Sequence, residues 1–307
     1  MRIVIALGGN ALLREGQKPT YDNQYSNLKK AAGQIAAVAR NPSTKLLVTH
    51  GNGPQIGCEL LRNEYAKSRL PVLPMHILNA ETQASIGSMI VAALSGEFKR
   101  RGISRGVATV LTHTVVNVRD PAFRHPTKPI GPFYTRAQLS AELRRGRFSY
   151  VEERGKFRRV VPSPKPMAVL ESAAIKAMVS NGTVVVAGGG GGIPIVNSGR
   201  AYAGVAAVID KDSTARLMAN AMHADTLVIL TDVSGLYHDY PNSRSIVRRM
   251  SARELKLTIP KLEEGTMRPK AEACVRFLEN GGSRAYIGKL PDLEKILAGK
   301  AGTAISR

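Results

Sequence analysis

The 307-residue sequence predicts an α/β fold with a parallel sheet covered by helices on both faces. Short apolar runs alternate with segments of helical spacing, and several of these runs are apolar without interruption. The alternation is typical of parallel strands joined by crossover helices, and uninterrupted runs are typical of strands buried on both faces. Three of the runs end in glycine-rich turns. The length allows two domains or one large α/β unit.

The predicted elements follow from this pattern in chain order. Strands are expected at the continuous apolar runs, residues 4–7, 46–48, 107–116, 184–186 and 227–230. Helices are expected where apolar residues recur at helical spacing, at residues 28–38, from 55 onward, and at 80–97, 215–222 and 271–278. Basic residues and then Gly102 follow the segment 80–97, which is typical of a helix end.

Residues 120–166 interrupt the alternation. They are rich in proline and hold two short β-like pieces, 148–152 and 158–161, around a turn at Gly155. They also carry a local excess of positive charge, with eleven Lys and Arg against four Asp and Glu. We expect an inserted excursion from the main sheet. It is either a surface decoration or a loop that carries binding residues on a rigid scaffold.

The charge balance limits the possible partners. The chain has 44 Lys and Arg against 23 Asp and Glu, a formal net charge of +21. This charge suits nucleic acid, an anionic membrane or a small, multiply charged substrate. The basic residues are scattered, and aromatic residues make up 5% with no Trp, which argues against nucleic acid. Because there is no membrane-spanning apolar run and no signal-peptide pattern, we expect a cytoplasmic protein without a membrane partner.

The glycine-rich turns at residues 8–10, 51–53 and 188–192 indicate a phosphate-bearing ligand. Parallel strands present their carboxyl ends at one edge of a sheet, where ligands bind. Glycine lets backbone N–H groups approach an anion closely. The chain has no P-loop motif, and the third turn runs into Ile193 rather than a helix, so neither a P-loop nor a Rossmann site is expected. The histidines show no metal-ligand spacing; if a metal takes part, it is Mg²⁺ that arrives with the nucleotide.

Two lysines stand at predicted helix starts. Lys211 lies between Asp210 and Asp212, and Lys270 lies in the segment before residues 271–278. In one interpretation, Asp212 or Ser213 caps the helix and the lysines are solvated. In the other, the lysines hold a phosphoryl group and Asp212 fixes Lys211 in its charged form. Lysine near a helix N-terminus is unfavourable unless an anion lies between them, so the pair favours an anion.

Together, these segments resemble the carbamate kinases of the amino-acid-kinase superfamily. The similar motifs run in order along the chain: GGNAL (8–12), THGNGPQIG (49–57), PTKPIGPFY (126–134), RRVVPSPKP (158–166), AVIDKD (207–212) and GTMRPK (265–270). The resemblance implies a three-layer αβα sandwich with a mainly parallel central sheet of about eight strands and a small protruding subdomain. It implies one domain over residues 1–307, with a carbamate-binding half at about 1–180 and a nucleotide-binding half at about 181–307. Residues 120–166 would form the protruding lid.

The resemblance also implies an activity. It is the Mg²⁺-dependent, reversible transfer of a phosphoryl group between ATP and carbamate, giving ADP and carbamoyl phosphate, by a homodimer. Carried over residue by residue, it assigns a catalytic role to Lys128, Lys211 and Asp212. The substrate-binding residues would be Gly8, Gly9, Asn10, Gly51 and Asn52. The nucleotide-binding residues would be Lys211, Asp232, Tyr237, Met267, Pro269 and Lys270, and no metal ligand is assigned.

Two segments depart from the family pattern, and two other functions stay open. Arg268 stands where the family usually has glycine, and residues 231–237 look more like the nucleotide loop of other superfamily kinases. Arg268 would either contact a phosphate or turn outward. The alternatives are a superfamily kinase for another small carboxylate, UMP or an alkyl phosphate, and a catalytically silent, basic nucleic-acid-binding protein.

Overall fold

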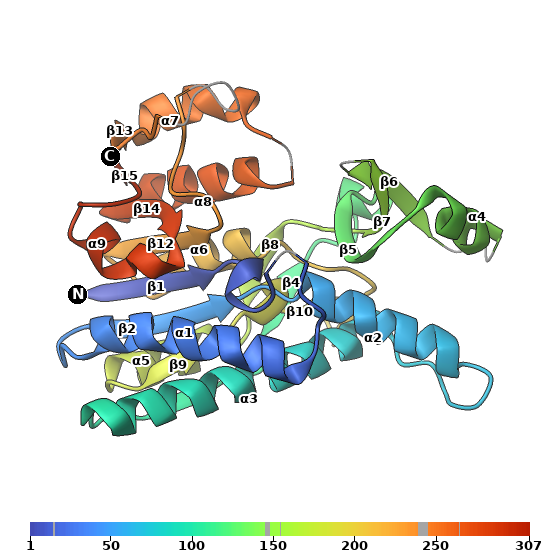
Figure 1. Cartoon of the computed structure of the whole chain (residues 1–307), viewed down its shortest axis with the longest axis horizontal. Helices are drawn as coiled ribbons and strands as arrows, with labels where there is room; N and C mark the ends of the chain where they lie inside the picture. Colours follow the sequence, from blue (N-terminus) through green and yellow to red (C-terminus); the bar gives the residue numbers. More distant parts are fainter. Residues whose placement is uncertain (15, 145–147, 154, 239–244, 264) are drawn as a thin grey trace.

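A mainly parallel sheet forms the centre of the molecule, as the computed structural model shows (Figure 1). The structure describes residues 1–307 except 15, 145–147, 154, 239–244 and 264; the side chains of residues 10, 141–144 and 153 also lie outside the description. Among the described residues, eight strands follow the order β13-β15-β14-β12-β1-β2-β9-β3. Their bounds are Arg249–Ser251, Thr303–Ser306, Arg284–Lys289, Thr226–Thr231, Arg2–Leu7, Lys45–His50, Val184–Val186 and Val107–Thr109. The pairs from β14 to β3 are parallel, and β15 runs antiparallel to β14.

Helices cover both faces of this sheet, which confirms the predicted layers. Alternate residues of β1 enter separate cores, because successive side chains of a strand point to opposite faces. Ile3 and Ile5 pack with α1 (Tyr21–Ala39), α3 (Met75–Arg101) and α9 (Leu293–Leu297). Val4 and Ala6 pack with α5 (Ser172–Ser180), α6 (Lys211–Ala221) and α8 (Met267–Glu279). Among the described residues, the other α-helices outside the excursion are α2 (Gly53–Ala66) and α7 (Ala252–Thr258).

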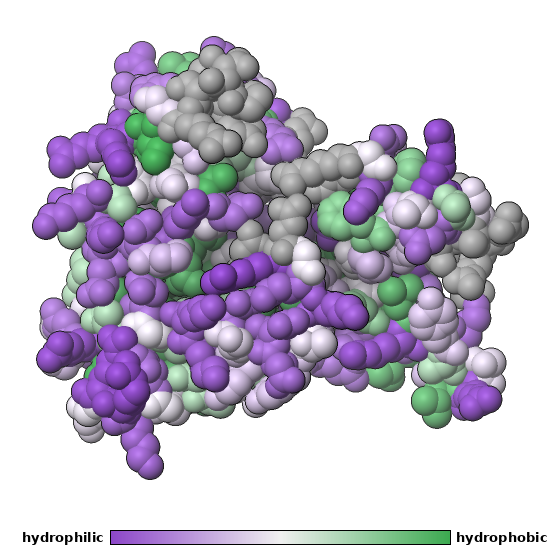
Figure 2. Space-filling model, in the orientation of Figure 1, coloured by the Kyte–Doolittle hydropathy of each residue, from purple (hydrophilic) through white to green (hydrophobic). Residues whose placement is uncertain are grey.

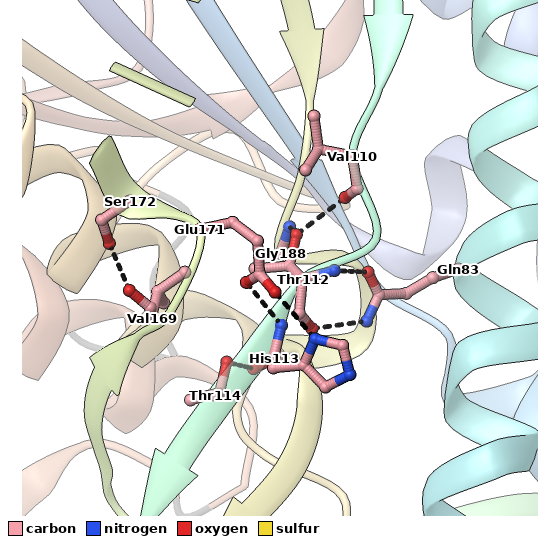
Figure 3. A network of polar contacts seen from close by, with 10 residues as sticks. Gln83, Val110, Thr112, His113, Thr114, Val169, Glu171, Ser172 and Gly188 are labelled. Atoms are coloured by element: carbon pink, nitrogen blue, oxygen red, sulfur yellow. Dashed lines mark hydrogen bonds and ion pairs between the residues drawn. The ribbon is translucent and has the colours of Figure 1, made fainter. Parts of the chain in front are cut away.

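The strand expected over residues 107–116 is wrong as a single strand. β3 ends at Thr109 in the main sheet, and β4 (His113–Val116) belongs to a second sheet with β8 (Pro166–Val169), β10 (Ile193–Asn197) and β11 (Tyr202–Gly204). Polar contacts hold the break at Thr112, whose backbone N–H and carbonyl bind the amide of Gln83 (Figure 3). The Thr112 hydroxyl accepts the N–H of Gly188 at 2.9 Å. The side chains of Gln83 and Thr112 and the backbone of Gly188 therefore decide where the chain changes sheet, and local hydrophobicity does not record this.

The excursion forms a small sheet beside the main body (Figure 1). β5 (Lys128–Tyr134) pairs with β7 (Lys156–Val161), which pairs with β6 (Ser149–Glu153). Helix α4 (Arg136–Arg144) connects β5 to this hairpin. The parts of the predicted lid at residues 145–147 and 154 lie outside the described residues.

Short turns connect the larger elements. They are 3₁₀ helices at η1 (Gly9–Ala11), η2 (Pro121–Phe123), η3 (Gly189–Gly191), η4 (Ile259–Lys261) and η5 (Leu290–Asp292). In the part of the chain that the structure describes, no helix combines the length and apolarity needed to cross a membrane.

Candidate active site

A cleft of about 1060 Å³ opens at the carboxyl ends of β1, β2 and β12. It brings together segments that are far apart in the sequence. Of the residues predicted for the site, those that line the cleft are Gly8, Gly9, Gly51, Asn52, Lys128, Lys211, Asp212, Asp232, Tyr237, Met267, Pro269 and Lys270. Asn10 belongs to η1, and its side chain lies outside the described part of the structure.

Two of the glycine-rich turns form the wall beneath the cleft. Asn52 follows β2 and is buried, and its side-chain amide donates to Asn79 Oδ1 at 3.1 Å and to Thr82 Oγ1 at 3.0 Å on α3. Gly190, from the third turn, has a φ of +62°, and a Cβ there would lie 2.3 Å from the Asn52 amide. Only glycine fits that contact without displacing Asn52. The turn after β2 is therefore fixed from two sides.

Asp210 links the start of α6 to the excursion. Its Oδ1 accepts the backbone N–H of Ser213 at 2.9 Å, which makes Asp210 the N-cap of α6. Its Oδ2 accepts the Lys128 ammonium of β5 at 2.9 Å. The expectation that Asp212 or Ser213 caps this helix is wrong, because α6 begins four residues before the predicted 215. The Asp212 carboxylate is left for other partners.

Asp212 holds two lysines with its two oxygens. Lys211 Nζ lies 2.6 Å from Oδ1, and Lys270 Nζ lies 3.3 Å from Oδ2. Lys270 also donates to the Thr266 carbonyl at 2.9 Å. The Asp212 side chain is only 3% exposed, so the ion pairs are shielded from water. Three ammonium groups, including that of Lys128, thus meet two carboxylates at one edge of the cleft.

Burial and charge oppose each other in this cluster. Burial raises the pKa of Asp212, but Lys211 and Lys270 outweigh it, so the pKa lies below its ordinary value. Burial likewise raises the pKa of Asp210, and Lys128 and the Ser213 N–H outweigh it. Burial lowers the pKa of Lys211 below its usual value, whereas Asp212 and Asp210 raise the pKa of Lys270 in spite of burial. Each charged group in the cluster is therefore stabilised by an oppositely charged neighbour.

The other side of the cleft is formed by the loop after β12 and the start of α8. Asp232, Tyr237, Met267 and Pro269 line it. Arg268 is not among the lining residues, and one of its guanidinium nitrogens donates to the Pro260 carbonyl at 3.2 Å. Arg268 therefore packs against η4 with its Nε buried, rather than entering the cleft or extending into solvent.

Among the residues given no role from the sequence are two that line the cleft, Asp210 and Arg158, and the buried His50 next to it. Asp210 lies within the motif at 207–212, and its pairing with Lys128 spans 82 positions, so no local spacing could reveal it. Arg158 of β7 also lines the cleft. His50, at the end of β2, is buried, and its Nδ1 lies 3.0 Å from the Gly51 carbonyl. Burial, together with the charge of Lys211, lowers the pKa of His50 to about 4 despite that contact, so the ring is neutral near neutral pH.

Comparisons with known proteins identify the chain. The model of the amino acid kinase family matches residues 1–289, so the chain belongs to that family. It is 41% identical to a carbamate kinase of Pyrococcus horikoshii over 99% of both chains, and 40% identical to one of Haemophilus influenzae over 100% of this chain and 97% of the other. Within the family, the chain belongs to the carbamate kinases.

Solved structures agree with this assignment. A carbamate kinase from Giardia lamblia bound to citric acid superposes with a TM-score of 0.93 at 35% identity, over 99% of this chain and 98% of the other. The same enzyme bound to AMP-PNP gives a TM-score of 0.89 at 34% identity, over the same shares of both chains. An N-acetylglutamate synthase from Neisseria gonorrhoeae is 17% identical with a TM-score of 0.60, so that likeness concerns the fold alone.

Proposed function

We propose that this chain transfers a phosphoryl group reversibly between ATP and carbamate, with Mg²⁺ entering as part of the nucleotide substrate. The observation that carries the proposal is the cluster of Lys128, Lys211 and Lys270 in one cleft with two fixed glycine turns. A transferring phosphoryl group carries negative charge on three oxygens, and positioned cations stabilise it. The cluster offers such cations, and its aspartates hold them in place.

In the forward direction, a carbamate oxygen forms a bond to the γ-phosphorus while the bond from that phosphorus to the β–γ bridging oxygen breaks. ADP leaves with the electron pair of the broken bond, and carbamoyl phosphate is the other product. Carbamate is already an anion, so its oxygen needs no general base. The site accordingly requires cations and N–H donors rather than a histidine base, and the neutral, buried ring of His50 is compatible with this.

Carbamate and the nucleotide would bind at different sides of the cleft. Gly51 and Asn52 would hold carbamate on the β2 side, where Asn79 and Thr82 fix the turn. Gly8, Gly9 and Asn10 would lie near the transferred group, and Lys128 and Lys211 would bind its oxygens. We assign Asp212 to the orientation of Lys211 and Lys270, because it contacts both.

The nucleotide would lie between the loop after β12 and the start of α8. Lys211, Asp232, Tyr237, Met267, Pro269 and Lys270 would contact it. Among the described residues, no three His, Cys, Asp or Glu side chains gather as a metal-ligand set. We propose that phosphate oxygens and water hold most of the coordination sphere of Mg²⁺, as is usual for this ion.

The test is ATP formation from ADP with a panel of phosphoryl donors. Carbamoyl phosphate should give ATP at a rate at least about 100-fold above acetyl phosphate, isopentenyl diphosphate or UDP, because only carbamoyl phosphate would match the acceptor side. A donor that equals or exceeds carbamoyl phosphate would contradict the proposal and favour another kinase of the family.

We propose further that the chain works as a homodimer, as its resemblance to the family implies. Light scattering on the purified protein should give twice the mass of the chain. A monomer mass at working concentration would contradict this. A cytoplasmic location stays a prediction from the sequence.

A further inference from the structure

We propose that Glu64 and Arg159 form a positioning pair for Lys128. The pair docks the protruding sheet on α2 and thereby sets where the Lys128 ammonium enters the cleft. The inference rests on the proposed function only for what Lys128 does; the docking itself stands on contacts outside the cleft.

The first observation is the ion pair. Arg159 Nη1 lies 2.7 Å from Glu64 Oε1, and Nη2 lies 3.1 Å from Oε2, which is a bidentate contact between β7 and α2. The Arg159 side chain is only 4% exposed. Its guanidinium carbon lies 3.6 Å from the centre of the Phe148 ring, so an aromatic face also covers the charge. A bidentate pair whose arginine is buried specifies one geometry more strictly than a fully exposed ion pair.

The second observation is backbone contact at the same interface. A Cβ built on Gly57 of α2 would lie 1.9 Å from the Cα of Gly131 on β5. The helix and the strand therefore touch through two glycines, with no side chain between them. Ile56, Ile130 and Val161 pack into one buried cluster beside this contact. The interface is thus close-packed, and the ion pair lies at its edge.

The pairing of β5 with β7 links the position of Arg159 to that of Lys128. In the pairing of β5 with β7, Ile130 stands opposite Arg159, and Lys128 stands opposite Val161. Lys128 is therefore two residues along the strand from the position that Arg159 clamps. Its Nζ reaches Asp210 across the cleft at 2.9 Å. Among the described residues, Glu64 pairs with Arg159 and does not line the cleft, so it would act through β7 and β5 rather than on the substrate.

The experiment compares Glu64→Gln with Glu59→Gln. Both variants remove one carboxylate from α2, but Glu59 pairs with Arg62, whose side chain is 72% exposed. We expect Glu64→Gln to lower kcat for ATP formation about tenfold, because small misplacements of a catalytic group are costly. The KM for ADP should stay within about twofold, and Glu59→Gln should stay within about twofold in both parameters. Arg159→Lys, which keeps the charge and loses the fork, is the second variant.

A double-mutant cycle separates positioning from general stability. In a Lys128→Ala background, Glu64→Gln should change kcat by less than about twofold, because the group that it positions is gone. If Glu64→Gln lowers kcat by the same factor with and without Lys128, or behaves like Glu59→Gln, the positioning role is wrong.

Hydrogen exchange tests the docking without any activity. Amides of β5 should exchange about tenfold faster in Glu64→Gln than in the parent, and at the parent rate in Glu59→Gln. If the parent forms no ATP from carbamoyl phosphate, the proposed function fails. The docking is then decided by this exchange alone, and unchanged exchange of β5 overturns it.

Discussion

At the scale of single residues, Lys211 is a nearly buried lysine that pairs with a carboxylate. Its side chain is 11% exposed, and its ammonium pairs with Asp212 at 2.6 Å. Lys211→Ala should lower kcat at least about 100-fold with the fold intact, because one positioned donor to a developing charge contributes about 3 kcal/mol. Steady-state kinetics and a melting curve measure both.

Lys256→Ala is the matched control for Lys211→Ala. Lys256 also pairs with a carboxylate, that of Glu279 at 2.7 Å, but it is 65% exposed and is not among the cleft-lining residues. Its loss should leave kcat unchanged. If Lys211→Ala turned over like this control, Lys211 would have no role in the reaction beyond its ion pair with Asp212.

Arg268 provides a second prediction, because the structure places its guanidinium at the Pro260 carbonyl. Arg268→Gly should leave ADP and ATP affinity within about twofold, although glycine in the first turn of α8 should cost up to about 1 kcal/mol of stability. Lys270→Ala is the positive control, since Lys270 lines the cleft. A loss of about 1.5–3 kcal/mol in nucleotide binding by Arg268→Gly would show a phosphate contact instead.

Protonation of His50 should affect the free energy of unfolding. Its pKa falls from the usual 6.5 to about 4, mainly through burial. The unfolded chain therefore binds the proton more readily between these values, and the stability contributed by the neutral ring is present above the unfolded pKa and lost as pH falls toward the folded one. Between about pH 7 and about pH 4.5, this group alone should lower the free energy of unfolding by roughly 2–3 kcal/mol.

Urea unfolding of the parent and His50→Gln at both pH values measures this effect. The variant should lose that much less stability on acidification, whatever its stability at neutral pH. Parallel pH profiles for the two proteins would mean that His50 is not the group responsible.

At the scale of elements, the excursion and α2 form one packed unit through Gly57 and Gly131. The sequence predicts that residues 120–166 are a lid that brings Lys128 over the site. If so, ADP with carbamoyl phosphate should slow hydrogen exchange in β5 and β7, because closure excludes water. Because α2 packs directly on β5, we expect α2 to gain protection from exchange together with β5 and β7.

Helix α9 is the internal reference for the lid, since its main contacts lie with α1, β14 and η5 and none of its residues lines the cleft. Its exchange should not respond to ligands. Identical hydrogen exchange of β5 with and without ligands would contradict the lid hypothesis. Ligand-induced protection of β5 without protection of α2 would mean that the two elements move separately.

At the scale of the whole molecule, the net charge of +21 is the least specific property. Hydrophilic residues spread over much of the face that Figure 2 displays, with small apolar groups among them. We expect binding to duplex DNA to be weak and to vanish near about 0.15 M salt, because scattered cations give only non-specific, counterion-driven attraction. ATP formation from carbamoyl phosphate should persist at that salt concentration.

A salt titration of DNA binding beside the activity assay checks this. Tight DNA binding that survives about 0.15 M salt, in a protein without phosphoryl transfer, would favour the nucleic-acid-binding alternative. Such an outcome would also leave the cluster of Lys211, Asp212 and Lys270 without a function.

Local patterns in the sequence predict the layered α/β fold and the ligand edge of its sheet, and the resemblance to the family implied most of the residues that line the cleft. A continuous apolar run such as residues 4–7 predicts a buried strand, and a glycine turn after it predicts an edge of the sheet where a ligand binds. The order of motifs from GGNAL to GTMRPK then pointed to the family. These signals survive in sequence because each depends on neighbours within a few positions.

Which side chains meet follows from the three-dimensional packing alone. The break of the strand at Thr112 needs Gln83 and Gly188, and the partner of Lys128 is Asp210, 82 positions away. The contact of Gly57 with Gly131 joins two elements that the sequence describes separately. Hydrogen bonds, ion pairs and close backbone approach act over a few ångströms in space, whatever the separation along the chain, so no local pattern can record them.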